Sequence, residues 1–202
     1  MQLVQPSVAL PSPAQIGPLP QHLEQIAEAR LRGKKIRRAV TIATLSGWSL
    51  AIFAGITLLT GLFDPPTLML GAGLGLAACI EVRGARDLRR LQVRAPKRLA
   101  SNQVFLGASV AAYAGYNLWR AMFGPSPLSA GANDPQVSEM LGSFDNLARG
   151  ISALIYGAIM LVGVLVPGCT ALYYASRRRH IEQFIAQSPP WIVELHRRGI
   201  GI

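Results

Sequence analysis

The chain has 202 residues, half of them hydrophobic, with a mean hydropathy of +0.32 and a formal charge of +10. This composition is typical of a helical membrane protein and excludes a large soluble domain. The basic residues cluster beside apolar segments, which favours contact with anionic lipid head groups over binding of nucleic acid. No nucleic-acid partner is therefore expected.

The first twenty residues, 1–20, contain five prolines and no Lys or Arg. This is the composition of a disordered Pro-rich tail rather than of a secretory signal peptide. Apolar residues at helical spacing then predict a helix from 21 to 38, whose second half carries six basic residues. We expect this helix to lie along the inner membrane surface.

Residues 39–63 form a run of twenty-five positions without a charged side chain. As a helix this run is about 37 Å long, which exceeds the roughly 30 Å hydrocarbon core of a bilayer. A turn at Asp64-Pro65-Pro66 leads to a shorter apolar segment, 66–82. We predict that it also crosses, because the seven basic residues after it would otherwise lie opposite the first basic cluster.

The rest of the chain is predicted to contain two further spans joined by an outer loop, with basic segments beside them. A short amphipathic helix in the outer loop is predicted to begin at Asp134-Pro135. Eighteen of the twenty Lys and Arg then lie on one side of the membrane, so both termini are predicted to be cytoplasmic. The segments are a connector helix 83–98, a span 99–123, an outer loop 124–150 with the helix 135–148, a span 151–176 and a cytoplasmic tail 177–202.

An internal repeat appears when the chain is shifted by sixty residues. Arg30–Pro65 then aligns with Arg90–Pro125 without a gap, and eleven of thirty-six positions are identical. We therefore predict an all-α membrane protein with four transmembrane helices, built from two tandem helical hairpins of the same orientation, plus interfacial amphipathic helices. The first repeat covers 21–82 and the second 83–202, and a symmetry axis along the membrane normal is expected.

Small residues recur every four positions on the predicted spans. In lipid, such stripes let two helix backbones approach closely, so they predict the faces on which the helices pack and form a four-helix bundle. The predicted helix-packing residues are Gly47, Ala51, Gly55, Gly71, Gly75, Gly107, Ala111, Gly115 and Gly157.

Polar groups within the spans are few. Glu81, Asn102 and Asn117 are candidates for a polar pathway, whereas the favoured interpretation of Glu81 is an ion pair with Arg83, Arg86 or a neighbouring basic helix. The three histidines show no metal-ligand spacing, and no acid, base or nucleophile falls at the predicted bilayer midplane. No enzymatic activity, metal or cofactor is therefore expected.

The stretch from Ser101-Asn102-Gln103 to Trp119 and the stretch from Arg177 to Trp191, with Ser-Pro-Pro-Trp, resemble small uncharacterised bacterial membrane proteins with several spans. The resemblance covers the C-terminal half of the chain and implies no activity. The predicted location is the bacterial inner membrane, with membrane insertion itself following from the apolar spans.

The leading functional hypothesis is a non-enzymatic accessory or scaffold protein whose basic cytoplasmic face binds anionic lipid or an acidic partner. The alternative is a small oligomeric channel or transporter, and a second copy of the chain or another membrane protein is the further partner considered. The candidate lipid- or partner-binding residues are Lys34, Lys35, Arg37, Arg38, Arg89, Arg90, Arg94, Lys97, Arg98, Arg177, Arg178 and Arg179.

Overall fold

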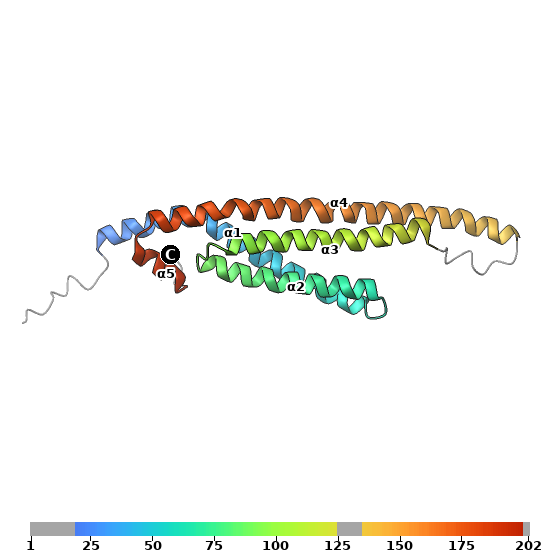
Figure 1. Cartoon of the computed structure of the whole chain (residues 1–202), viewed down its shortest axis with the longest axis horizontal. Coiled ribbons are helices and arrows are strands. Elements are labelled where there is room, and N and C mark those ends of the chain that lie inside the picture. Colours follow the sequence, from blue (N-terminus) through green and yellow to red (C-terminus); the bar gives the residue numbers. More distant parts are fainter. Residues whose placement is uncertain (1–18, 125–134, 200–202) are drawn as a thin grey trace, which may run out of the picture.

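A computed structural model describes residues 19–124 and 135–199. Within these ranges the chain forms five helices and no strand, which confirms the expected all-α class (Figure 1). The predicted Pro-rich tail, except for its last two residues, and positions 125–134 of the predicted outer loop lie outside the described residues. The helices are α1 (Pro20–Thr60), α2 (Pro65–Arg89), α3 (Ala95–Phe123), α4 (Pro135–Gln187) and α5 (Pro190–Arg197).

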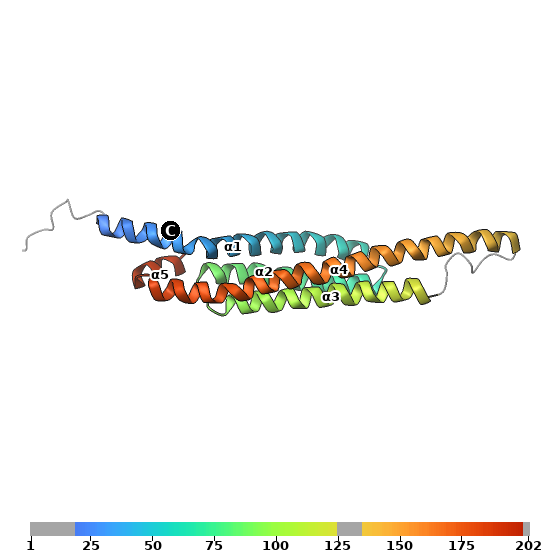
Figure 2. The same ribbon diagram turned by 90° about the horizontal axis from the view of Figure 1, so that it is seen from above.

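The helices form an elongated bundle. α1 packs along α2, α3 packs along α4, and α2 lies against α3 (Figures 1 and 2). α1 has 41 residues and α4 has 53, so both exceed α2 and α3 in length. The N-terminal part of α1 and the C-terminal part of α4 continue beyond the link between α2 and α3, and α5 lies beside them (Figure 1). We call this end of the bundle, including the link between α2 and α3, the basic end.

Proline marks the start of each described helix. Pro fits the first turn of a helix because the N–H that it lacks would have no partner within the helix there. At α2 the side chain of Asp64 also accepts a hydrogen bond from the backbone N–H of Thr67 at 3.2 Å, so Asp64 is the N-cap. The polar turn predicted at Asp64-Pro65-Pro66 thus ends α1 and begins α2.

The buried side of the helices repeats at alternating steps of three and four residues. This is the heptad spacing of helices that cross at about 20° and interlock along their length. On α1 the buried series is Ala29, Gly33, Ile36, Val40, Ala43, Gly47 and Ala54, and on α2 it is Gly71, Leu74, Ala78, Glu81, Ala85 and Leu88.

The larger of two hydrophobic clusters lies at the basic end, where parts of all five helices meet. Leu88, Leu99 and Ile181 are fully buried there, on α2, α3 and α4. A smaller cluster around Ala54, Leu74, Ala77 and Leu106 lies farther along the bundle. The basic end is therefore packed like the core of a soluble domain, whereas the other end exposes most of its apolar side chains.

The predicted stripes of small residues contact other helices only in part. A Cβ atom on Gly47 would lie 2.8 Å from Cγ2 of Val82, and one on Gly71 would lie 2.9 Å from Cγ of Leu58. By contrast, among the described residues no atom of another element lies within 4 Å of such a Cβ at Gly55, Gly115 or Gly157.

Helix geometry explains this difference. Four residues are more than one turn of 3.6, so each step of four turns the stripe by about 40° away from the partner helix. The residues that face the neighbouring helix are instead Ala54 and Ala114, which lie seven residues after Gly47 and Gly107 and are buried. Ala51 is exposed, Ala111 is half-buried, and Gly75 approaches Cβ of Ala54 at 3.9 Å.

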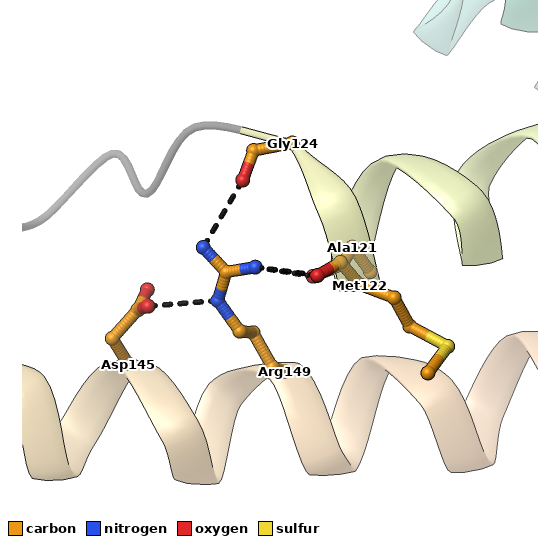
Figure 3. Close-up of polar contacts among 5 residues, drawn as sticks. All are labelled: Ala121, Met122, Gly124, Asp145 and Arg149. Atoms are coloured by element: carbon orange, nitrogen blue, oxygen red, sulfur yellow. Dashed lines mark hydrogen bonds and ion pairs between the residues drawn. The ribbon is translucent and has the colours of Figure 1, made fainter.

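α4 is a single helix where the sequence predicted a short helix, a junction and a span. Arg149, at the expected junction, is an ordinary helical residue whose side chain turns toward the C-terminus of α3. It donates hydrogen bonds to Asp145 at 2.8 Å and to the carbonyl oxygens of Ala121, Met122 and Gly124 at 3.2, 2.9 and 3.1 Å (Figure 3). Because the last carbonyls of a helix lack helical partners, this cation caps α3 and ties it to α4.

α5 packs its apolar side onto the basic end. Ile192 and Val193 are buried, and the ring of His196 lies against that of Phe184, with 5.7 Å between the centroids. Nδ1 of His196 is buried and has no hydrogen-bond partner among the described residues. Burial, and secondly the charge of Arg37, lower the pKa of His196 below its ordinary value of 6.5.

This lowered pKa predicts that acid weakens the docking of α5. The undocked histidine binds a proton more readily, so docking is strongest above about pH 6.5 and is lost as the pH falls through the lower pKa of the docked ring. The melting temperature of the wild type should fall more between about pH 7.5 and 5 than that of His196→Phe, which keeps a ring but does not titrate. Parallel pH profiles for the two proteins would contradict the assignment.

Candidate functional site

Three described helices are long and apolar enough to cross a membrane: α1, α2 and the part Phe144–Gln187 of α4. α3 has 29 residues but does not reach the same apolar level. The outward surfaces of the candidate spans carry large apolar side chains, as expected for contact with lipid. Examples are Leu45, Trp48, Ile52, Phe53 and Ile56 on α1, and Leu154, Leu161 and Leu165 on α4.

All three basic clusters lie at the basic end. The first lies on the N-terminal half of α1, the second on the end of α2 and the start of α3, and the third on the end of α4 and on α5 (Figure 1). Their members are exposed except Arg177, which is half-buried with its guanidinium 4.2 Å from the ring centre of Tyr173. The structure thus brings the twelve candidate lipid-binding residues to one end of the bundle.

Acidic residues neutralise little of this charge. Only four of the eighteen cations form salt bridges with described acidic residues: Arg32 with Glu28 at 3.0 Å, Arg98 with Asp87 at 3.2 Å, Arg178 with Glu182 at 2.9 Å and Arg198 with Glu194 at 2.9 Å. Such pairs contribute less than about 1 kcal/mol in water, so an incoming anion can compete for these cations. The basic end therefore presents a net positive surface.

A second polar site lies inside the bundle, at Glu81 of α2, which is fully buried. Its carboxylate accepts hydrogen bonds from Nδ2 of Asn102 at 2.8 Å, Nε2 of Gln103 at 3.1 Å and the hydroxyl of Tyr174 at 2.8 Å. Asn102 also donates to the carbonyl of Ala77 at 3.0 Å. We call Glu81, Asn102, Gln103 and Tyr174 the Glu81 cluster.

The Glu81 cluster joins three helices and packs against a fourth. Its donors come from α3 and α4, and Glu81 comes from α2. On the remaining side, a Cβ on Gly47 of α1 would lie 3.4 Å from Cβ of Glu81, so this glycine leaves room for α2 to approach α1. A buried carboxylate needs such a set of donors, because losing water without replacement is costly.

The structure brings some of the predicted polar residues together and separates others. Glu81 and Asn102 are bonded to each other, whereas Asn117 donates to the carbonyl of Tyr113 on its own helix at 2.9 Å. Asn117 is fifteen residues from Asn102, or about 22 Å along α3. No salt bridge joins Glu81 to Arg83 or Arg86 in the described part of the chain, and both arginines are exposed.

The sequence did not predict that two members of the cluster, Gln103 and Tyr174, bond to Glu81. For Gln103 the sequence predicted an interhelical hydrogen bond or an interfacial position, but not the partner. Tyr174 is 93 positions from Glu81, and no local pattern links the two. The available signal was the Asn102-Gln103 pair, since two adjacent amides in an apolar helix need partners on neighbouring helices.

The residues at these two sites differ in what they can bind. In the described ranges, no three His, Cys, Asp or Glu side chains come close enough to hold a metal ion. The Glu81 cluster contains one carboxylate, two amides and a phenol that bond to one another inside the bundle. The basic end offers many cations at a surface, which suits anions rather than a defined reaction.

The fold and these sites describe a helical bundle with three membrane-capable helices, one basic end and one internal polar cluster. Comparisons of the chain with protein-family models, with curated proteins and with solved structures find no match. What the protein does must therefore be inferred from its own residues.

Proposed function

We propose that the chain is a non-enzymatic integral membrane protein, an accessory or scaffold component that binds anionic lipid through its basic end. The observation that carries the proposal is the gathering of eighteen of the twenty Lys and Arg at one end of an apolar bundle. By the positive-inside rule this end faces the cytoplasm, and in a bacterium the membrane is the inner one. The described C-terminal helix α5 belongs to the same end.

Four spans fit this arrangement better than three. α3 lies between α2 and α4 and packs on both of them (Figure 1). If α2 and α4 cross the bilayer, α3 occupies the same slab, and its polar side chains Asn102 and Gln103 are covered by its neighbours. The α1–α2 and α3–α4 pairs are then two hairpins that enter from the same side, in agreement with the internal repeat.

The energy for lipid binding comes from summed charge. Each Lys or Arg close to an anionic leaflet contributes about 1 kcal/mol, and the effect fades within a Debye length of about 8 Å. The link between α2 and α3 is well placed for this contact, because four exposed cations lie on it or on the adjoining helix ends: Arg89, Arg90, Arg94 and Lys97. No described acidic side chain forms a salt bridge with any of them.

The test replaces these four cations by Gln in the full chain. After purification in mild detergent, the anionic phospholipid that copurifies, measured by lipid mass spectrometry, should fall to roughly half or less, because about 4 kcal/mol of attraction is removed. A matched variant with Lys at positions 89, 90 and 94 keeps the charge and should retain wild-type lipid. Wild-type lipid in the Gln variant would refute the proposal.

A further inference from the structure

A groove of about 360 Å³ runs between α2 and α3, at the border between the basic end and the apolar part of the bundle. Each helix contributes four residues at successive spacings of three, one and three, which places them on one face of that helix. The lining residues are Ile80, Arg83, Gly84 and Asp87 on α2, and Arg98, Ser101, Asn102 and Phe105 on α3.

The groove is polar at one end and apolar at the other. Because α2 and α3 are antiparallel, Asp87 meets Arg98 at the polar end, where they form an ion pair of 3.2 Å. Ile80 and Phe105 line the opposite end, and the ring of Phe105 is 43% exposed. The groove therefore has the polarity of an amphiphile with a charged head and an apolar tail.

Arg83 lies between these two ends. It is exposed, and within the described residues it makes no ion pair or hydrogen bond. The exposed hydroxyl of Ser101 lines the same stretch of the groove. A guanidinium presents several donors in a plane and matches a phosphate group, to which a serine hydroxyl can add one more donor.

The floor of the groove is set by close packing. A Cβ atom on Gly84 would lie 2.5 Å from Cδ2 of Leu99, so the absence of a side chain at this position lets α3 approach α2. Asn102 lines the groove and also donates to Glu81, so it joins the groove to the Glu81 cluster. The floor is therefore held by contacts that exist without a ligand.

We propose that this groove binds one anionic phospholipid, with its phosphate at Arg83 and Ser101 and an acyl chain along Ile80 and Phe105. The occupant is a lipid rather than a free phosphate because Ile80 and Phe105 make one end of the groove apolar. The groove also opens where head groups meet hydrocarbon in the proposed orientation. The inference rests on the proposed function and deepens it, since it replaces a diffuse positive surface by one defined lipid site.

Native mass spectrometry of the full chain in detergent tests this site. Dioleoyl phosphatidylglycerol is titrated, and the affinity of the first bound lipid is measured. We expect Arg83→Gln to weaken this first step about tenfold, the loss expected for one charge-assisted contact. Arg86→Gln is the matched control, since Arg86 is equally exposed on α2 but does not line the groove.

A second variant, Ser101→Phe, fills the groove from an exposed position and should abolish the first step without lowering the melting temperature. Dioleoyl phosphatidylcholine should bind more weakly than phosphatidylglycerol, and glycerol 3-phosphate should not displace the lipid. Equal affinities for Arg83→Gln and Arg86→Gln would overturn the site. Displacement by glycerol 3-phosphate would overturn its assignment to a phospholipid.

Failure of the site and failure of the proposed function give different results. If the basic end binds lipid but the groove does not, substitution of the four link cations lowers the total lipid, while Arg83→Gln matches its control. If the groove alone binds lipid, Arg83→Gln removes the first step, while the four-fold substitution leaves the total lipid unchanged.

Discussion

Gly163→Val should destabilise the bundle more than any other single substitution in α4 that we consider. A Cβ atom at this position would lie 2.4 Å from Cγ1 of Val110 on α3. Valine is stiff at its first side-chain torsion in a helix, so Val110 cannot turn away freely. The contact continues at Gly107, where a Cβ would lie 3.3 Å from the carbonyl oxygen of Gly163. Pro167, which has no N–H to offer that carbonyl, is buried beside it.

The measurement is reversible unfolding in mixed micelles, with Gly157→Val as the control. Gly157 lies on the same helix, and no atom of another element in the described part of the chain lies within 4 Å of its Cβ position. Both variants carry the same cost of a β-branched residue in a helix, so the difference isolates packing against α3. We expect Gly163→Val to lose about 1–3 kcal/mol more than Gly157→Val. Equal losses would show that α3 and α4 do not meet at these glycines.

Glu81→Leu should have an effect of similar size for a different reason. The substitution removes the shared acceptor and leaves the donors of Gln103 and Tyr174 buried without their bond to Glu81. A buried donor without a partner costs about 1–3 kcal/mol, so the free energy of unfolding should fall by about 3 kcal/mol. Glu182→Leu, at an exposed carboxylate of α4, should change it by less than about 0.5 kcal/mol.

A double variant tests whether the loss of stability in Glu81→Leu comes from the broken hydrogen bond to Tyr174. When Tyr174→Phe is added to Glu81→Leu, one stranded donor disappears together with its acceptor. Replacing both partners of a buried hydrogen bond by apolar groups is often nearly neutral, so the double variant should recover about 1 kcal/mol relative to Glu81→Leu. If each change lowered stability independently, the hydroxyl of Tyr174 would not depend on Glu81.

Most of what could be predicted about the helices followed from residues close together in the sequence. Uncharged runs of known length indicate membrane-capable helices, and Asp64 followed by two prolines indicates where one helix ends and the next begins. Both features depend only on neighbouring residues. The clustering of cations also follows from sequence, because consecutive antiparallel helices return every second link to the same end.

Features that depend on contacts between distant residues were harder to predict. Arg149 and Gly150 suggested a break before the last span, because a cation beside an apolar segment usually marks a boundary. The helix continues because the C-terminus of α3 accepts the hydrogen bonds of Arg149. In the same way, Glu81 was expected to pair with a nearby arginine, and its bond to Tyr174 appears only when α2 and α4 are placed together.

The small-residue stripes show that the choice of a four-residue spacing limited the prediction of helix contacts. Steps of four identified Gly47, Gly71 and Gly107, each of which packs closely against another helix. The same steps also selected Gly55, Gly115 and Gly157, where the stripe has rotated away from the partner. A heptad reading would have selected Ala54 and Ala114 in place of the first two, because seven residues nearly complete two turns.

The position of Glu81 also has a consequence for assembly. Smooth apolar helices can slide along one another in lipid at little cost, since every sliding position exposes similar surfaces. Here three donors on two helices reach one acceptor on a third, and a shift of one turn, about 5.4 Å, would separate all of them at once. A single carboxylate thus fixes the position of α2 along α3 and α4, so that none of the three helices can move by a turn without breaking these bonds.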